Sequence, residues 1–137
     1  MRFLGHLEPE VAEGIAGRVE AAEPAGFELE LGAVGSFKRG RLARVVWLGL
    51  SRGDAEIGEL ARLVEAESVR AGLEPESRKF HAHLTLARAR ERDGAELPEL
   101  PAPPRLPAWK GAELVLYRSI LGRGGSVYQP LRSIRLR

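Results

Sequence analysis

The chain is organised around the stretch Arg78-Lys79-Phe80-His81-Ala82-His83-Leu84-Thr85-Leu86-Ala87-Arg88-Ala89-Arg90. Apolar residues alternate here with residues capable of chemistry, and this alternation is typical of a β-strand. Residues i and i+2 of a strand share a face. One face would carry His81, His83, Thr85 and Ala87, and the other would carry Ala82, Leu84 and Leu86. We expect the leucine face to pack on a hydrophobic core and the other face to present an imidazole beside a hydroxyl.

The pair of His83 and Thr85 suits phosphate chemistry. An imidazole can give or take a proton near neutral pH, and a hydroxyl can donate a hydrogen bond to a non-bridging phosphate oxygen. A histidine on a strand is more often structural, so both interpretations stay open from these residues alone. A metal site at His81 and His83 is a weaker alternative, because catalytic zinc usually needs a third protein ligand and this strand contains no acidic residue.

Other side chains near this stretch could contribute to binding. Arg88 would lie on the face opposite His83 in a regular strand, and it would reach a phosphate there only if the strand twists or ends early. The aromatic rings of Phe80, Trp47 and Trp109 could stack on nucleobases. Core packing is the better interpretation for Trp47, which lies in a continuously apolar segment.

Composition limits the class of protein. The chain has 137 residues, of which 44% are hydrophobic and 29% charged, and this suits one soluble globular domain. It contains no cysteine, which excludes disulfides, thiolate metal sites and cysteine nucleophiles. The first residues lack the apolar run of a signal peptide, and no segment approaches the roughly 20 apolar residues that span a bilayer. We therefore expect a cytoplasmic protein.

Charge is distributed unevenly along the chain. Residues 101–137 contain seven lysines or arginines and one acidic residue, although the whole chain has a net charge of only +2. A basic C-terminal third fits a polyanionic partner such as nucleic acid. The alternative is that the arginines reflect the base composition of the genome.

The order of expected elements indicates an α+β fold with antiparallel strands. We expect helices over residues 9–22 and 54–71, the second ending at Gly72. Glycines at 32, 35 and 40 predict a bent loop, too long for a tight turn, between two strands at residues 27–31 and 45–50. Prolines make residues 93–108 a loop. A final hairpin joins strands 112–121 and 126–136 through residues 122–125, with an edge or bulge at Pro130.

Residues 80–88 resemble the second His-x-Thr-x motif of the 2H phosphoesterases, and most of all the RNA 2′,3′-cyclic phosphodiesterases, also called 2′-5′ RNA ligases. Ala82 departs from the family, which usually has proline before the motif histidine. The resemblance extends over nearly the whole chain. Its other blocks are residues 27–32, 35–37, 45–50, 116–119 and 125–128.

The resemblance implies a bilobal α+β fold with antiparallel sheets, outer helices and a groove between two similar lobes. Each lobe supplies one His-x-Thr-x motif, with one histidine as general base and the other as general acid, and no metal or nucleotide cofactor is implied. The reaction opens a terminal 2′,3′-cyclic phosphate of RNA to a 2′-phosphate, and the reverse type of chemistry joins tRNA halves. By this resemblance His83 and Thr85 are catalytic, and Arg88, Phe80 and Tyr128 bind substrate.

The beginning of the chain departs from the family. The first family motif runs His-x-Thr-Leu-Arg-Phe-Leu-Gly, and residues 1–5 match only its tail. His6 follows the motif and cannot replace its histidine. We therefore expect residues 1–137 to form a single domain that lacks its N-terminal segment, most simply because the start codon was assigned too far downstream; a truncated or naturally shortened protein is the alternative. Such a chain should be slow, and an unpaired sheet edge should make it dimeric or prone to aggregation.

Two other functions remain open. In the first alternative, the chain is a non-catalytic remnant domain that binds RNA through its basic C-terminal third and the remaining half of the groove. In the second it is a cyclic phosphodiesterase acting on cyclic nucleotides or nucleotide sugars, since the residues lining the groove decide the substrate.

Overall fold

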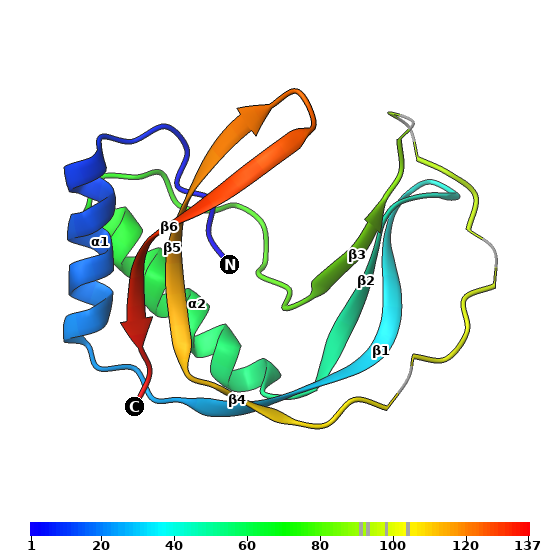
Figure 1. Cartoon of the computed structure of the whole chain (residues 1–137), viewed down its shortest axis with the longest axis horizontal. Coiled ribbons are helices and arrows are strands. Elements are labelled where there is room, and N and C mark those ends of the chain that lie inside the picture. The colour runs from blue at the N-terminus through cyan, green and yellow to red at the C-terminus, as the bar shows by residue number, and fades with distance from the viewer. Residues whose placement is uncertain (91, 93, 98, 104) are drawn as a thin grey trace. The chain divides into compact units, whose positions relative to one another are not determined.

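The computed structural model describes residues 1–137 except 91, 93, 98 and 104 (Figure 1). Its elements are α1 (Pro9–Ala21), β1 (Phe27–Arg39), β2 (Leu42–Arg52), α2 (Asp54–Arg70), β3 (Leu84–Arg88), β4 (Trp109–Gly111), β5 (Glu113–Gly122) and β6 (Gly125–Arg135). The pairings β1–β2, β2–β3 and β5–β6 are antiparallel, which confirms the predicted α+β class. The chain divides into two compact units: unit 1 comprises residues 1–27, 59–80 and 111–137, and unit 2 comprises residues 28–58 and 81–110.

Unit 1 packs its helical segments against the base of a β-hairpin. α1 begins at Pro9, a residue that suits the first turn because its missing N–H has no helical partner there. α2 ends two residues before Gly72, so both helices predicted from apolar spacing are confirmed. The core of this unit consists of Ala16, Val19, Val64 and Ile134, with Leu63, Leu114 and Leu116 packed against it.

A buried carboxylate connects the two helices of unit 1. Glu67 is only 6% exposed, and its Oε2 accepts a hydrogen bond from Nε of Arg18 at 2.8 Å. Nη1 of Arg70 lies 3.0 Å from the other carboxylate oxygen. These partners satisfy a charge that would otherwise be costly to bury.

The hairpin of unit 1 is also tied to α1 by charge. Arg132 of β6 forms ion pairs with Glu20 and, at 3.1 Å, with Glu13. Hydrogen bonds to Glu20 and then to Glu13 raise the pKa of Arg132 above its ordinary value. These contacts lie near the base of the hairpin, where β6 is packed on the helix.

Strands β5 and β6 pair along their whole length and turn at residues 122–125, as the sequence predicted. Leu116 pairs with Arg132, but Tyr117 pairs with Pro130, so Leu131 is left without a partner in the ladder. This irregularity is a β-bulge, which accommodates a proline because the ladder is interrupted there. Of the two expectations for Pro130, an edge or a bulge, the bulge is confirmed, with the extra residue directly after the proline.

Unit 2 contains most of a four-stranded sheet with the order β3-β2-β1-β4. The predicted hairpin of its first two strands is confirmed, but the predicted long loop between them is wrong. β1 continues to Arg39, and only Gly40 and Arg41 connect it to β2. Gly40 has φ +61°, a conformation that glycine adopts easily in tight turns.

The strand predicted around the histidines is shorter than expected. β3 begins at Leu84, so His81 and His83 lie in the segment that leads into it. Leu84 and Leu86 are 51% and 53% exposed, which makes the predicted packing of the leucine face on a core wrong. β3 is an edge strand of the sheet, and these two leucines are not packed on a core. Of the three residues expected on this face, Ala82, Leu84 and Leu86, only Ala82 is buried.

The connection from β3 to β4 has no regular helix or strand in its described residues, as the prolines predicted. Ala95 makes an isolated bridge with Ala43, and their backbone groups exchange two hydrogen bonds of 2.9 Å. Among the helices of the described residues, none is long and apolar enough to cross a membrane.

Candidate active site

Thr85 is placed by its pairing with the neighbouring strand. It lies opposite Trp47 of β2, and Leu84 lies opposite Leu48. Side chains of directly paired residues point to the same face of a sheet. Thr85 and Trp47 therefore share one face, and Leu84 and Leu48 share the other. His83, one residue before Leu84, leads into the strand on the side of Thr85.

A bulge in β3 brings Arg88 to the same face. Trp47 pairs with Thr85, whereas Val46 pairs with Ala87 and Val45 with Arg88, so Leu86 is the extra residue. Val45 and Trp47 are two residues apart on β2 and share a face, and their partners Arg88 and Thr85 must share it too. The sequence placed Arg88 on the opposite face in a regular strand. The bulge corrects this, and it also moves Ala87 to the face opposite Thr85.

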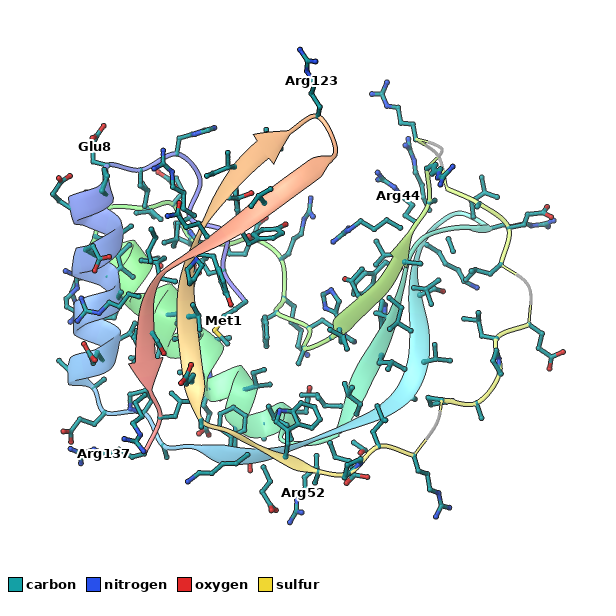
Figure 2. All side chains as sticks on the ribbon, in the orientation of Figure 1. Met1, Glu8, Arg44, Arg52, Arg123 and Arg137 are labelled. Carbon is teal, nitrogen blue, oxygen red and sulfur yellow. The ribbon has the colours of Figure 1, made fainter. Side chains whose placement is uncertain are left out.

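Pairing continues just past Arg88. The backbone N–H of Ala89 donates to the carbonyl oxygen of Arg44 at 2.9 Å. Arg44 is labelled in Figure 2, near the N-terminal end of β2 and beside the C-terminal end of β3. The backbone at Arg88 and at the residue after it is therefore paired with β2, and the side chain of Arg88 is exposed.

The imidazole of His83 is fixed by a local hydrogen bond. Its Nδ1 lies 2.7 Å from the backbone carbonyl oxygen of His81. A carbonyl oxygen can only accept, so Nδ1 carries the proton and Nε2 is the nitrogen left for a ligand. In its neutral form the ring then offers a lone pair at Nε2, and after protonation it offers a donor at the same atom.

Three other rings surround the imidazole of His83. The Phe37 ring is nearly perpendicular to the His83 ring at a centroid distance of 5.0 Å and to the His81 ring at 5.5 Å. The indole of Trp47 lies 4.6 Å from His81 and 5.4 Å from Phe37. Edge-to-face contacts of this kind are favourable and restrict ring orientation. We call Phe37, Trp47, His81 and His83 the ring cluster.

Gly35 makes room for the ring cluster. It lies opposite Trp47 in the sheet, and a Cβ atom at this position would lie only 2.3 Å from Cη2 of the indole. The indole therefore lies directly over the backbone of β1, an approach that only glycine permits. Phe37, two residues further along β1, shares this face.

Sequence reasoning did not find Phe37 or the role of Gly35. The glycines at 32, 35 and 40 indicated a loop, so no face was assigned to Phe37. The available signal was the pair of segments 33–37 and 45–49, which carry an aromatic residue and a small residue at opposite positions of a hairpin. Trp47, for which the sequence favours core packing, is partly buried, and its indole contacts the rings of both histidines.

Of the remaining candidates, Trp109 belongs to unit 2 and is 43% exposed, and the others belong to unit 1. Phe80 is half-buried and Tyr128 is exposed, and both belong to unit 1. Tyr128 contacts the ring of Tyr117 within β5–β6. His6 is exposed and belongs to unit 1. Among the described residues there is no group of three or more His, Asp or Glu side chains that could hold a metal ion.

The model of the 2′-5′ RNA ligase superfamily matches residues 2–122. The chain belongs to this superfamily. It is 33% identical over 144 residues to the RNA 2′,3′-cyclic phosphodiesterase of Aeropyrum pernix, with 98% of this chain and 79% of the relative covered. It is also 33% identical over 135 residues to the RNA 2′,3′-cyclic phosphodiesterase of Escherichia coli, with 96% and 71% covered.

Solved structures of the superfamily have the same fold. The crystal structure of E. coli LigT complexed with 3′-AMP has a TM-score of 0.83 and 30% identity, covering 98% of this chain and 74% of that one. A crystal structure of a phosphoesterase gives a TM-score of 0.82 at 30% identity, with 98% and 73% covered. The 2H phosphoesterase resemblance is thus confirmed.

Proposed function

We propose that this protein is an RNA 2′,3′-cyclic phosphodiesterase, a hydrolase that opens terminal 2′,3′-cyclic phosphates of RNA to 2′-phosphates without a metal ion. Membership of the superfamily and curated relatives of that name support the activity. The observation that carries the proposal within the chain is the fixed imidazole of His83, whose Nδ1 donates to the His81 carbonyl oxygen and leaves Nε2 for a ligand, on the side of the strand that carries Thr85.

His83 supplies one of the two acid/base groups of the reaction. Water attacks phosphorus, the bond between phosphorus and the 3′ oxygen breaks, one proton leaves the water and one proton reaches the 3′ oxygen. Nε2 of His83 can accept the first proton when neutral or deliver the second when protonated. The family's other acid/base histidine belongs to its first motif, whose tail residues 1–5 resemble.

Thr85 and Arg88 hold the phosphate in this proposal. Both residues share a face of β3, because the bulge at Leu86 places Arg88 on the face of Thr85. A hydroxyl donates one hydrogen bond to a non-bridging oxygen, and a guanidinium can donate two and offset the charge that develops at phosphorus. The two residues therefore provide complementary contacts to one phosphate.

We further propose that Phe80 and Tyr128 contact the nucleoside part of the substrate by stacking. Broken tRNA halves with cyclic phosphate ends are the physiological substrate we would test first, and joining them through a 2′-5′ bond is the related reaction to assay. Both proposals rest on the family resemblance and on the exposed ring of Tyr128.

The test uses a short RNA that ends in a 2′,3′-cyclic phosphate, with protein in molar excess so that a single turnover is detected. We expect a 2′-phosphate product, distinguished from the 3′-phosphate by chromatography against both standards. His83→Ala should lower the rate by about 10²–10⁴-fold, the usual contribution of a general acid or base. His6→Ala is the matched control and should leave the rate unchanged.

Two results would contradict the proposal. Equal rates for the wild type and His83→Ala would exclude an acid/base role for His83. RNA binding without any hydrolysis, and independent of His83, would favour the alternative of a non-catalytic RNA-binding protein.

A further inference from the structure

The β5–β6 hairpin is packed on one side of its bulge and exposed on the other. On the side away from the turn, Leu114, Leu116 and Ile134 pack in the core of unit 1. From the bulge to the turn, every residue from 117 to 131 is exposed. We call residues 117–130 the distal hairpin. An exposed two-stranded hairpin gains little stability from burial, so large apolar side chains along it are unexpected unless a ligand covers them.

The distal hairpin nevertheless carries large side chains. Leu121 is 87% exposed, Tyr128 65%, Val127 61% and Tyr117 52%. Tyr117 pairs with Pro130, and Ser119 pairs with Tyr128, so both tyrosines point to one face as diagonal neighbours. Their rings are nearly perpendicular, with centroids 6.4 Å apart.

The charge of the hairpin indicates which ligand would cover it, a nucleic acid or a second copy of the chain. Residues 114–137 contain five arginines and no acidic residue. Arg132 and Arg137 are paired with glutamates. Arg118 and Arg123 have no ion-pair partner among the residues that the structure describes. Arg118 lies opposite Gln129 on the face away from the tyrosines, and Arg123 extends from the turn (Figure 2).

We propose that the distal hairpin binds single-stranded RNA, with bases stacking on Tyr117 and Tyr128 and phosphates attracted by Arg118 and Arg123. This inference rests on the proposed function for the identity of the substrate as RNA. Aromatic side chains combined with unpaired cations are the usual means of holding a single strand without reading its sequence. A surface without acidic residues has no attraction for a second copy of itself, because two such hairpins would repel each other.

The test measures binding rather than turnover, and so remains informative if hydrolysis fails. The probe is a fluorescent 12-nucleotide RNA ending in a 2′-phosphate, titrated by anisotropy at several salt concentrations. The logarithm of affinity should fall with the logarithm of salt by about 0.7 per neutralised phosphate of a single strand. The double variant Arg118→Ala/Arg123→Ala should therefore reduce the slope by about 1.4.

A separate pair of substitutions at Tyr117 tests the stacking of bases. Tyr117→Ala should weaken binding by between about 5-fold and 100-fold, the effect of removing one base stack. Tyr117→Phe keeps the ring and should bind as the wild type does, which separates stacking from any disturbance of the hairpin.

The control variant is Arg52→Ala/Arg62→Ala, which removes the same charge from arginines that already face Glu28 and Glu59. It should leave the salt slope unchanged. A wild-type slope in the Arg118→Ala/Arg123→Ala variant would overturn the proposal. Concentration-dependent dimerisation in sedimentation, abolished by Leu121→Ser, would also overturn it and would identify a second copy as the occupant.

Discussion

The histidine segment of unit 2 and the distal hairpin of unit 1 both expose polar and aromatic side chains, but only the first is held by its neighbours. His83 is fixed by a hydrogen bond of 2.7 Å and by the Phe37 ring at 5.0 Å. In the distal hairpin, the contact between Tyr117 and Tyr128 is the one ring contact among the described residues. The first surface is therefore preorganised for chemistry, and the second is free to adapt to a flexible strand.

Of the variants in this comparison, Thr85→Val should have the largest effect on catalysis. It removes a hydroxyl that donates a hydrogen bond to the phosphate from the preorganised surface. Valine keeps the shape of the side chain and lacks only the hydroxyl. We expect the rate of cyclic-phosphate opening to fall by about 10²–10³-fold, as for loss of one donor to a developing charge. Single-turnover assays measure it, and Thr85→Ser should retain most of the rate. A valine variant as fast as the wild type would mean that Thr85 does not touch the phosphate.

Gly35→Ala tests whether the ring cluster depends on the close approach of Trp47. The new Cβ would lie 2.3 Å from the indole, and the rigid ring must move. Overpacking of this kind typically costs about 1–3 kcal/mol. Thermal unfolding should show the loss, together with changed tryptophan fluorescence and slower catalysis.

The control for that variant is Gly58→Ala. A Cβ at Gly58 meets nothing within 4 Å, and alanine favours the helix interior by up to about 1 kcal/mol. If Gly35→Ala were as stable as Gly58→Ala, the indole would not be fixed over β1.

These two variants also mark the limit of sequence-based prediction. Apolar spacing predicted both helices, and apolar strand segments and turn residues predicted both hairpins, because each of these patterns is local. The three glycines after Leu31 indicated a loop for the same local reason. At Gly35, however, the glycine accommodates Trp47 from the neighbouring strand, and this need is visible only once the two strands are paired.

The candidate site shows the same limit. The pair of His83 and Thr85 could be chosen from the sequence, because i and i+2 spacing fixes their common side. The position of Arg88 could not, since the bulge at Leu86 arises from the pairing with β2. Alternation also predicted burial of Leu84 and Leu86, but alternation identifies only which residues share a face. Whether that face is covered depends on elements elsewhere in the chain.

Phe37→Leu should have a smaller effect than Gly35→Ala on stability and act mainly on catalysis. Leucine keeps apolar volume but loses the edge-to-face contact with His83, which is worth about 0.5–1.5 kcal/mol. We expect kcat to fall by about 2- to 10-fold with little change in KM, because the phosphate contacts remain. Phe37→Trp should restore kcat. A change confined to KM would instead assign Phe37 to substrate binding.

The distal hairpin should respond least to changes in its apolar side chains. Leu121 is 87% exposed, so Leu121→Ser removes almost no buried surface. We expect the free energy of unfolding to change by less than about 0.5 kcal/mol, as for other surface substitutions. The matched change at the base, Leu116→Ser, removes a side chain that packs against the core of unit 1 and should cost about 2–5 kcal/mol. Urea unfolding of the two variants measures the contrast. A large loss at Leu121 would mean that another part of the protein covers the distal hairpin, and its tyrosines would then not be free to receive RNA.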